Sequence, residues 1–370
     1  MASDPNMPKR ANRPGADQDA VFLGWQESLS GAIFPMYTII AADHPSYHST
    51  VSDRTLRKLG LRIPETPSPY TKIGPSPWQS LGIALSYPKT AREAIESAGL
   101  DYTIAKKPVE LAGLMQKAYA SVRTDTGEIL GIVGARYRPV QNRDAFALFD
   151  ELVGKQELVY ETAGVLGHGE RIWILAKLPG YMKINGNDIV NKYLLLINSH
   201  DGSAPVRAKV TPIRLVCNNT LTSALQGAGE VHIRYAPGAM QGAGQAASLL
   251  EFSESLFERL DLIFNRMALR TITEEQLQEY VRQLVPSDEE GENDAKTQKV
   301  RNDVLRLHDT GWGADLARGT MWGAFNSVTE YTDHLMLDED SATRLNSIWF
   351  GRGEQLKLKA FQLAERMMAA

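Results

Sequence analysis

Hydrophobic and polar residues follow two different periods along the chain, and the change between them falls near residue 240. Before that point, short segments rich in Val, Ile, Leu, Thr and Tyr are separated by Gly, Asn and Asp. This pattern is typical of antiparallel strands joined by hairpin turns. It predicts strands at 119–124, 129–135, 158–167, 170–178, 188–198, 205–217 and 230–236.

Four small clusters predict the turns between these strands, because Gly and Asn adopt the positive φ angles that tight turns require. They are Asp125-Thr126-Gly127, Gly167-His168-Gly169, Asn185-Gly186-Asn187 and Asp201-Gly202. In the last of them we expect the Asp201 side chain to accept a backbone hydrogen bond and Gly202 to take a positive φ.

Beyond residue 240 the apolar positions recur every three to four residues, which indicates amphipathic helices. The expected helices are about 246–270, 273–285, 296–309, 317–336 and 341–369. Two helices are expected earlier, one after Thr90 with Glu93 completing a capping box, and one at 142–153 with Asn142 as N-cap. The predicted fold class is therefore α+β, a mainly antiparallel β-sheet with packed helices followed by an all-helical C-terminal segment.

Four regions are expected along the chain. Residues 1–19 are polar and predict a disordered leader. Residues 20–77 form a small N-terminal unit, with a strand at 36–40 and a short helix from Ser52 to Gly60, and end in a proline-rich linker. The sheet-rich domain follows at 78–240, and the helical segment packed on it spans 241–370.

Composition narrows the class of protein. The net charge is −4, so no global basic field attracts nucleic acid or an acidic membrane. No run of about 18 apolar residues is present, so no membrane partner is expected. The single cysteine, Cys217, excludes an intramolecular disulfide and fits a reducing, cytoplasmic location.

Metal and cofactor motifs are missing from the sequence. The seven histidines include no His-Glu-x-x-His pattern, and no glycine-rich loop continues into the Lys-Ser/Thr of a phosphate-binding loop. We therefore expect neither a metal site nor a cofactor.

Two polar clusters invite a catalytic interpretation. His200 and Asp201 follow an apolar strand, but adjacent residues on an extended chain point to opposite faces, so a hairpin turn is favoured over a hydrolytic site. Cys217 precedes Asn218 and Asn219 at a strand end, where a core position is favoured over a reactive thiol.

Basic and aromatic side chains share faces of the predicted strands. Arg207 and Lys209 are two residues apart and so lie on one face of a strand. Arg171, Trp173 and Lys177 lie on one face of another strand for the same reason. Such a face could track a phosphate backbone and stack bases, although a solvated outer face is the simpler alternative. The candidate nucleic-acid-binding residues are Arg136, Arg138, Arg171, Trp173, Lys177, Arg207, Lys209, Arg214 and Arg234.

Several stretches also carry a family resemblance, among them LGIVGARYRPVQNRDAFALFDELV (130–153), LLLINSHDGSAPVRAKVTPIRLVCNNTL (194–221) and GTMWGAFNSVTEYTDHL (319–335). From about residue 78 to 370 the chain resembles the phage/plasmid-like proteins of the domain-of-unknown-function 932 family. The positions that match its strongest motifs are Tyr137, Gln141, Asn142, Gly164, His200, Asp201, Gly202, Arg214, Cys217, Asn218 and Asn219.

The resemblance implies a mobile genetic element in a bacterial cytoplasm, and no established catalytic residues. The leading hypothesis is an accessory protein that binds or anneals single-stranded DNA or RNA, as a homo-oligomer if it anneals. Two alternatives stay open. One is an interaction module that inhibits a host protein through its helices 317–369, and the other is a hydrolase centred on His200 and Asp201.

Overall fold

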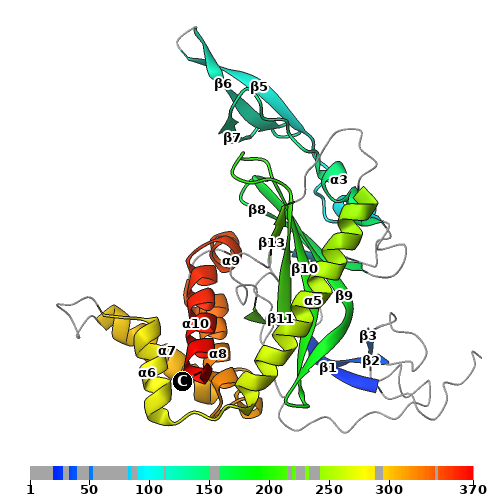
Figure 1. Cartoon of the computed structure of the whole chain (residues 1–370). Coiled ribbons are helices and arrows are strands. Elements are labelled where there is room, and N and C mark those ends of the chain that lie inside the picture. Colours follow the sequence, from blue (N-terminus) through cyan, green and yellow to red (C-terminus); the bar gives the residue numbers. More distant parts are fainter. Residues whose placement is uncertain are drawn as a thin grey trace, which may run out of the picture. The chain divides into compact units, whose positions relative to one another are not determined.

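The computed structural model describes residues 20–27, 33–39, 50–52, 82–85, 90–111, 114–150, 158–215, 219–221, 230–232, 242–287, 295–337 and 341–369 (Figure 1). The chain divides into two compact units, residues 1–73 and 74–370. The finer division at residues 78 and 240 stays a prediction.

The first unit contains a three-stranded antiparallel sheet in the order β1-β2-β3. Its strands are β1 (Ala20–Glu27), β2 (Ile33–Ile39) and β3 (Thr50–Ser52). The strand predicted at 36–40 overlaps β2 over residues 36–39. The predicted leader at 1–19, the helix after Ser52 and the proline-rich linker lie outside the described residues.

The second unit contains a seven-stranded sheet and a separate three-stranded sheet. The larger sheet has the order β12-β11-β10-β9-β8-β4, with β13 also paired to β11, and the smaller has the order β5-β6-β7. Every ladder described in them is antiparallel. The strands are β4 (Gly82–Ala84), β5 (Ile104–Leu111), β6 (Leu114–Arg123), β7 (Ile129–Val133), β8 (Val159–Leu166), β9 (Arg171–Ile184), β10 (Asp188–Ser199), β11 (Arg207–Arg214), β12 (Asn219–Thr220) and β13 (Glu230–His232).

All seven predicted strands are present, and the predicted turns join them. Gly127 and Gly202 adopt φ angles of 79° and 77°. The Ser203 N–H donates to Asp201 Oδ1 at 2.9 Å. The interpretation of the Asp201-Gly202 segment as a side-chain-closed turn is therefore confirmed. Strands β4, β5 and β12 of this unit were not predicted.

The helices follow in the order α2 (Ala91–Ser97), α3 (Asn142–Ala145), η1 (Ala147–Phe149), α5 (Gly242–Leu269), α6 (Glu274–Leu284), α7 (Ala295–Thr310), η2 (Ala314–Leu316), α8 (Met321–Glu330), the π-helix η3 (Tyr331–Leu335), α9 (Ser341–Phe350) and α10 (Arg352–Ala369). The α+β class with a helical C-terminal segment is confirmed. None of the described helices has the length and apolar character needed to cross a membrane.

Helix starts follow the capping rules in two places and depart from them in one. Thr90 Oγ1 accepts the Glu93 N–H at 3.2 Å, and Thr273 forms a complete capping box with Gln276. Asn142 is not the N-cap that was predicted, because Gln141 occupies that position. The helix predicted at 142–153 is also shorter, since α3 ends at Ala145 and continues as the 3₁₀ turn η1.

Helices cover both faces of the seven-stranded sheet. Even-numbered positions of β9, such as Ile174, pack in the main core with Phe257 of α5, which lies along this face in Figure 1. Odd-numbered positions, such as Trp173, pack in a second cluster with Ile348 and Trp349 of α9. The basic and aromatic face predicted from the sequence is the second one, so it is neither solvated nor open.

Candidate nucleic-acid interface

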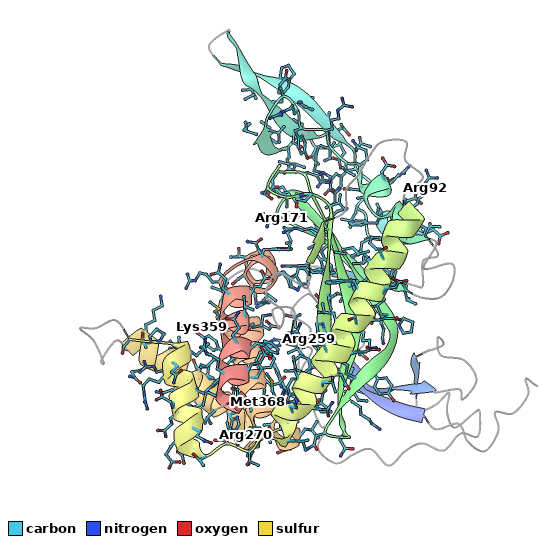
Figure 2. The ribbon with its side chains drawn as sticks, viewed as in Figure 1. Arg92, Arg171, Arg259, Arg270, Lys359 and Met368 are labelled. Carbon is cyan, nitrogen blue, oxygen red and sulfur yellow. The ribbon has the colours of Figure 1, made fainter. Side chains whose placement is uncertain are left out.

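The turn that follows β10 organises the polar groups at one end of the sheet. Arg171 Nη2 donates to Ser203 Oγ at 3.1 Å and lies 3.5 Å from Asp201 Oδ2. Its Nη1 donates to Asn346 Oδ1 at 2.7 Å. The guanidinium therefore joins the start of β9, the turn and helix α9. Figure 2 shows Arg171 at the end of the sheet nearest to β5–β7.

Basic side chains from neighbouring strands gather around the ring of Phe350. The Cζ atoms of Arg171 and Arg207 each lie 5.3 Å from the ring centroid, and Lys209 Nζ lies 5.1 Å from it. The strand register explains this convergence, because Arg171 is paired with Ser199 and Arg207 with Ile197 across β10. Cations are attracted to the negative face of an aromatic ring.

A second pair of arginines adjoins the same turn. Arg136 and Arg138 are exposed, and Tyr137 between them donates its hydroxyl to the His200 carbonyl at 3.4 Å. Lys106 Nζ donates to the Tyr137 carbonyl at 3.0 Å, which fixes this segment against β5. The backbone of β7 touches the turn as well, since a Cβ on Gly131 would lie 2.7 Å from Asp201 Cα.

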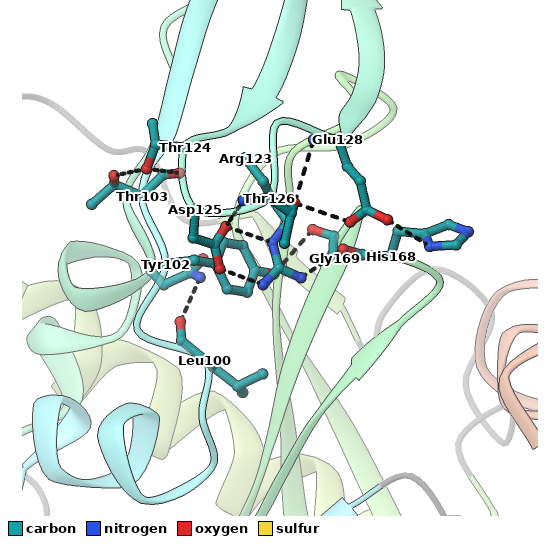
Figure 3. A network of polar contacts seen from close by, with 11 residues as sticks. Leu100, Tyr102, Thr103, Arg123, Thr124, Asp125, Thr126, Glu128, His168 and Gly169 are labelled. Carbon is teal, nitrogen blue, oxygen red and sulfur yellow. Dashed lines mark hydrogen bonds and ion pairs between the residues drawn. The ribbon is translucent and has the colours of Figure 1, made fainter.

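The base of the three-stranded sheet is clasped to the β8–β9 hairpin (Figure 3). Arg123 pairs with Asp125, donates to the His168 carbonyl at 2.8 Å and lies 3.9 Å above the Tyr102 ring. Tyr102 donates its hydroxyl to the Gly169 carbonyl at 3.1 Å, and burial raises its pKa to about 12. The clasp therefore holds the base of the three-stranded sheet against the end of the larger sheet where β8 and β9 meet.

His200 has a structural role in this arrangement. Its ring is fully buried, and Nε2 lies 2.6 Å from Asn142 Oδ1, while Asn142 Nδ2 donates to the Leu100 carbonyl. Burial lowers the His200 pKa to about 4, so the ring is neutral at physiological pH. Because Asp201 is engaged by Ser203 and Arg171 instead, the two side chains form no acid–base relay.

The other residues of the hydrolase hypothesis do not join them. His168 is exposed, with Nδ1 3.2 Å from Glu128 Oε1. Cys217, Asn218 and the Asn219 side chain lie outside what the structure describes. Within the described part of the chain, no three His, Cys, Asp or Glu side chains are grouped as metal ligands.

Three of the predicted nucleic-acid contacts are buried and serve packing. Trp173 is 1% exposed and stacks edge to face on Trp349 at 5.0 Å. Lys209 is 7% exposed, and its Nζ donates to Glu354 at 2.6 Å. Arg214 is 1% exposed, and its Nη2 lies 2.7 Å from Asp188 Oδ2. These three side chains belong to the interior and not to the open face that the sequence suggested. The reason is that α9 and the neighbouring helices cover their positions.

Two further candidates do not reach the cluster or lie beyond the structure. Lys177 is half-buried on the same face as Trp173, opposite Tyr193 in the register, six positions along β9 from Arg171. Arg234 lies outside the described residues. The sequence pattern did not point to Phe350 or Asn346 as site residues.

The C-terminal helices do not show the docking surface that one alternative requires. In the described part of 317–369, Leu335 is the large apolar side chain found exposed, at 43%. A protein-binding patch on a soluble domain extends over several such side chains. The structure therefore gives this alternative no surface.

Comparison with curated proteins and with solved structures finds no match. The family described as domain of unknown function DUF932 matches residues 129–349, which include β7 to β13, α5 to α8 and most of α9. The matched region contains the turn after β10 and the arginines around it, whereas Phe350 lies one residue beyond its end. The chain belongs to the DUF932 family.

Proposed function

We propose that this protein binds single-stranded nucleic acid through four arginines around the turn after β10. This set, the turn-end arginines, consists of Arg136, Arg138, Arg171 and Arg207. The observation that supports it is that all four belong to segments that meet at this turn. Arg136 and Arg138 flank Tyr137, whose hydroxyl donates to the His200 carbonyl. The guanidinium groups of Arg171 and Arg207 both lie near the Phe350 ring.

The local charge favours a polyanion even though the whole chain is acidic. Among the turn-end arginines, Arg171 lies 3.5 Å from the carboxylate of Asp201, which also accepts the Ser203 N–H. Arginine binds phosphate oxygens in a planar fork that lysine cannot reproduce. A short cationic rim therefore concentrates positive potential at one end of the sheet.

A single strand fits the geometry better than a duplex. Both sheet faces are covered, so no long flat surface is offered to a double helix. The half-buried Phe350 ring lies among the arginines, and ring–base stacking is characteristic of single-strand recognition. The mobile-element setting implied by the family resemblance fits a role in replication or annealing, and annealing requires an oligomer.

The test is fluorescence anisotropy with a labelled single-stranded oligonucleotide, titrated at several salt concentrations. Binding should weaken steeply as salt rises, because each neutralised phosphate releases counterions. The double variant Arg136→Gln, Arg138→Gln should bind more weakly and lower the salt slope by about 0.7 per lost contact. Both side chains are exposed, so their removal should leave thermal stability unchanged.

The matched control is Arg282→Gln. Arg282 is 59% exposed on α6, outside the turn-end arginines, and its loss changes the net charge by the same unit per residue. If Arg282→Gln weakens binding as much, per charge removed, as the Arg136→Gln, Arg138→Gln double variant does, the attraction is non-local and the proposed interface is wrong. Light scattering on the same samples reports whether the bound species is an oligomer.

A further inference from the structure

Two arginines of the seven-stranded sheet are partnered in opposite ways. Arg214 Nη2 lies 2.7 Å from Asp188 Oδ2, and its Nε donates to the same carboxylate, so its charge is neutralised at close range. In the described part of the chain, the carboxylate paired with Arg171 is Asp201, at 3.5 Å, beyond the roughly 2.7–2.9 Å typical of a charge-assisted bond. The Arg171 side chain is also 21% exposed, whereas that of Arg214 is 1% exposed.

Hydrogen-bond donors exceed acceptors around Arg171. Its Nε is buried without an acceptor in the described structure. Ser203 and Asn346 each accept from Arg171 through oxygen, which leaves the Ser203 hydroxyl hydrogen and the Asn346 amide hydrogens available. Both residues are exposed, so these donors can be reached from solvent.

This donor set differs from that of Arg136 and Arg138. Those two side chains stand on an open surface, where a continuous diester backbone can pass. Arg171 lies between β9, the turn and α9, and Ser203 and Asn346 contact the two terminal nitrogens of its guanidinium. A phosphate monoester carries about −1.5 to −2 charge and three strong acceptor oxygens, which matches a compact cluster of donors.

We propose that Arg171, Ser203 and Asn346 bind the terminal phosphate monoester of a nucleic-acid strand. The inference rests on the proposed function, because the strand is held by the turn-end arginines. The phosphate oxygens accept from the Arg171 guanidinium, the Ser203 hydroxyl and the Asn346 amide. The cationic group of Arg207 at the same Phe350 ring adds to the attraction.

The experiment compares four single-stranded oligonucleotides of one sequence by anisotropy at physiological salt. They carry a 5′-phosphate, a 3′-phosphate, both groups or neither, with the fluorophore at an internal position. One phosphorylated end should bind about tenfold tighter than the unmodified strand, since charge-assisted bonds are added. The two single-phosphate arms show which end is recognised.

The variants separate this inference from the proposed function. Arg171→Gln should abolish the preference for a phosphorylated end. Because Arg171 is one of the turn-end arginines, this variant should also bind the unmodified strand more weakly, with a lower salt slope, while Arg136, Arg138 and Arg207 keep part of that binding. Arg171→Lys keeps the charge, loses the planar fork and should retain only part of the preference. Ser203→Ala, on an exposed turn, should reduce the preference if Arg171→Gln proves too unstable to study. Arg282→Gln should leave the preference unchanged.

Equal affinity for all four strands would overturn the terminal-phosphate inference and leave the proposed function standing. A preference that survives in Arg171→Gln and Ser203→Ala would place the phosphate elsewhere and overturn the inference as well. Absence of binding to every strand at low salt would overturn both.

Discussion

Arg214 should contribute to stability and not to binding, and substituting it with Gln tests this directly. Its guanidinium donates to Asp188, to the Trp312 carbonyl at 3.3 Å and to the Gly313 carbonyl at 2.9 Å. Asp188 also accepts the Trp322 indole N–H at 2.8 Å. The pair therefore ties β10 and β11 to the loop before η2 and to helix α8.

The magnitude follows from the burial of both partners. Arg214 and Asp188 side chains are 1% and 2% exposed, so removing the cation leaves a carboxylate away from water with the Trp322 N–H as its remaining donor. Removing one member of a buried pair costs about 3–5 kcal/mol. For a unit that spans Gly74–Ala370, whose unfolding entropy is about 0.6 kcal/mol/K, that corresponds to a fall in Tm of roughly 5–8 °C.

The assay is thermal and urea unfolding followed by tryptophan fluorescence, with Asp188→Asn and the double variant completing a cycle. The double variant should be less destabilised than the sum of the two single variants, because neither charge is then buried alone. Folded Arg214→Gln should keep the affinity and salt slope for oligonucleotides. Native stability combined with weakened binding would refute the reasoning and return Arg214 to the interface.

Two further predictions concern packing. Burial raises the pKa of Glu330 to about 7, above its ordinary 4.5, so its contribution to stability is complete below about pH 4.5 and is lost as the pH rises through 7. Glu330→Gln keeps an acceptor for the Trp312 N–H. In this variant the urea concentration at the unfolding midpoint should depend less on pH between about pH 5 and 7 than in the parent protein. An unchanged pH dependence would contradict the raised pKa of this carboxyl. Gly131→Ala should cost about 1–3 kcal/mol, measured by urea unfolding, because its Cβ would lie 2.7 Å from Asp201 Cα and O. Gly134→Ala is the control, since nothing lies within 4 Å of that Cβ.

Local chemistry made much of the fold predictable. The hairpins are set by residues such as Gly127 and Asn185, whose positive φ angles are needed at the turn itself. The helix starts at Thr90 and Thr273 follow from side-chain oxygens that accept the N–H three residues later. These signals act within a few residues, so the sequence pattern contains them.

Other features depend on partners far along the chain. Strand β5 has Lys106, Lys107 and Pro108 in its centre, a poor strand sequence that is stable because β5 is an edge strand paired with β6. Asn142 resembles an N-cap, yet its side chain bonds His200, 58 residues away. Tertiary pairing overrides local preference at both positions.

The candidate site was half predictable for the same reason. Strand parity correctly placed Arg171 and Trp173 on one face, but parity does not say what covers a face. Helix α9, about 170 residues further along, buries Trp173 under Trp349 and leaves Arg171 at the rim. The convergence on Phe350 requires the packed helix and is not encoded in any one strand.

Helices pack on both faces of the seven-stranded sheet, so the residues that stabilise the fold differ from those proposed to bind a ligand at its end. Positions inside the two apolar clusters are constrained by volume, whereas positions 136, 138, 203 and 346 are exposed. Ser203 and Asn346 share Arg171 as a hydrogen-bond partner, so changes at these two positions are coupled. On the proposed function, substitutions at the exposed positions 136 and 138 should therefore alter binding without compensating changes in the interior.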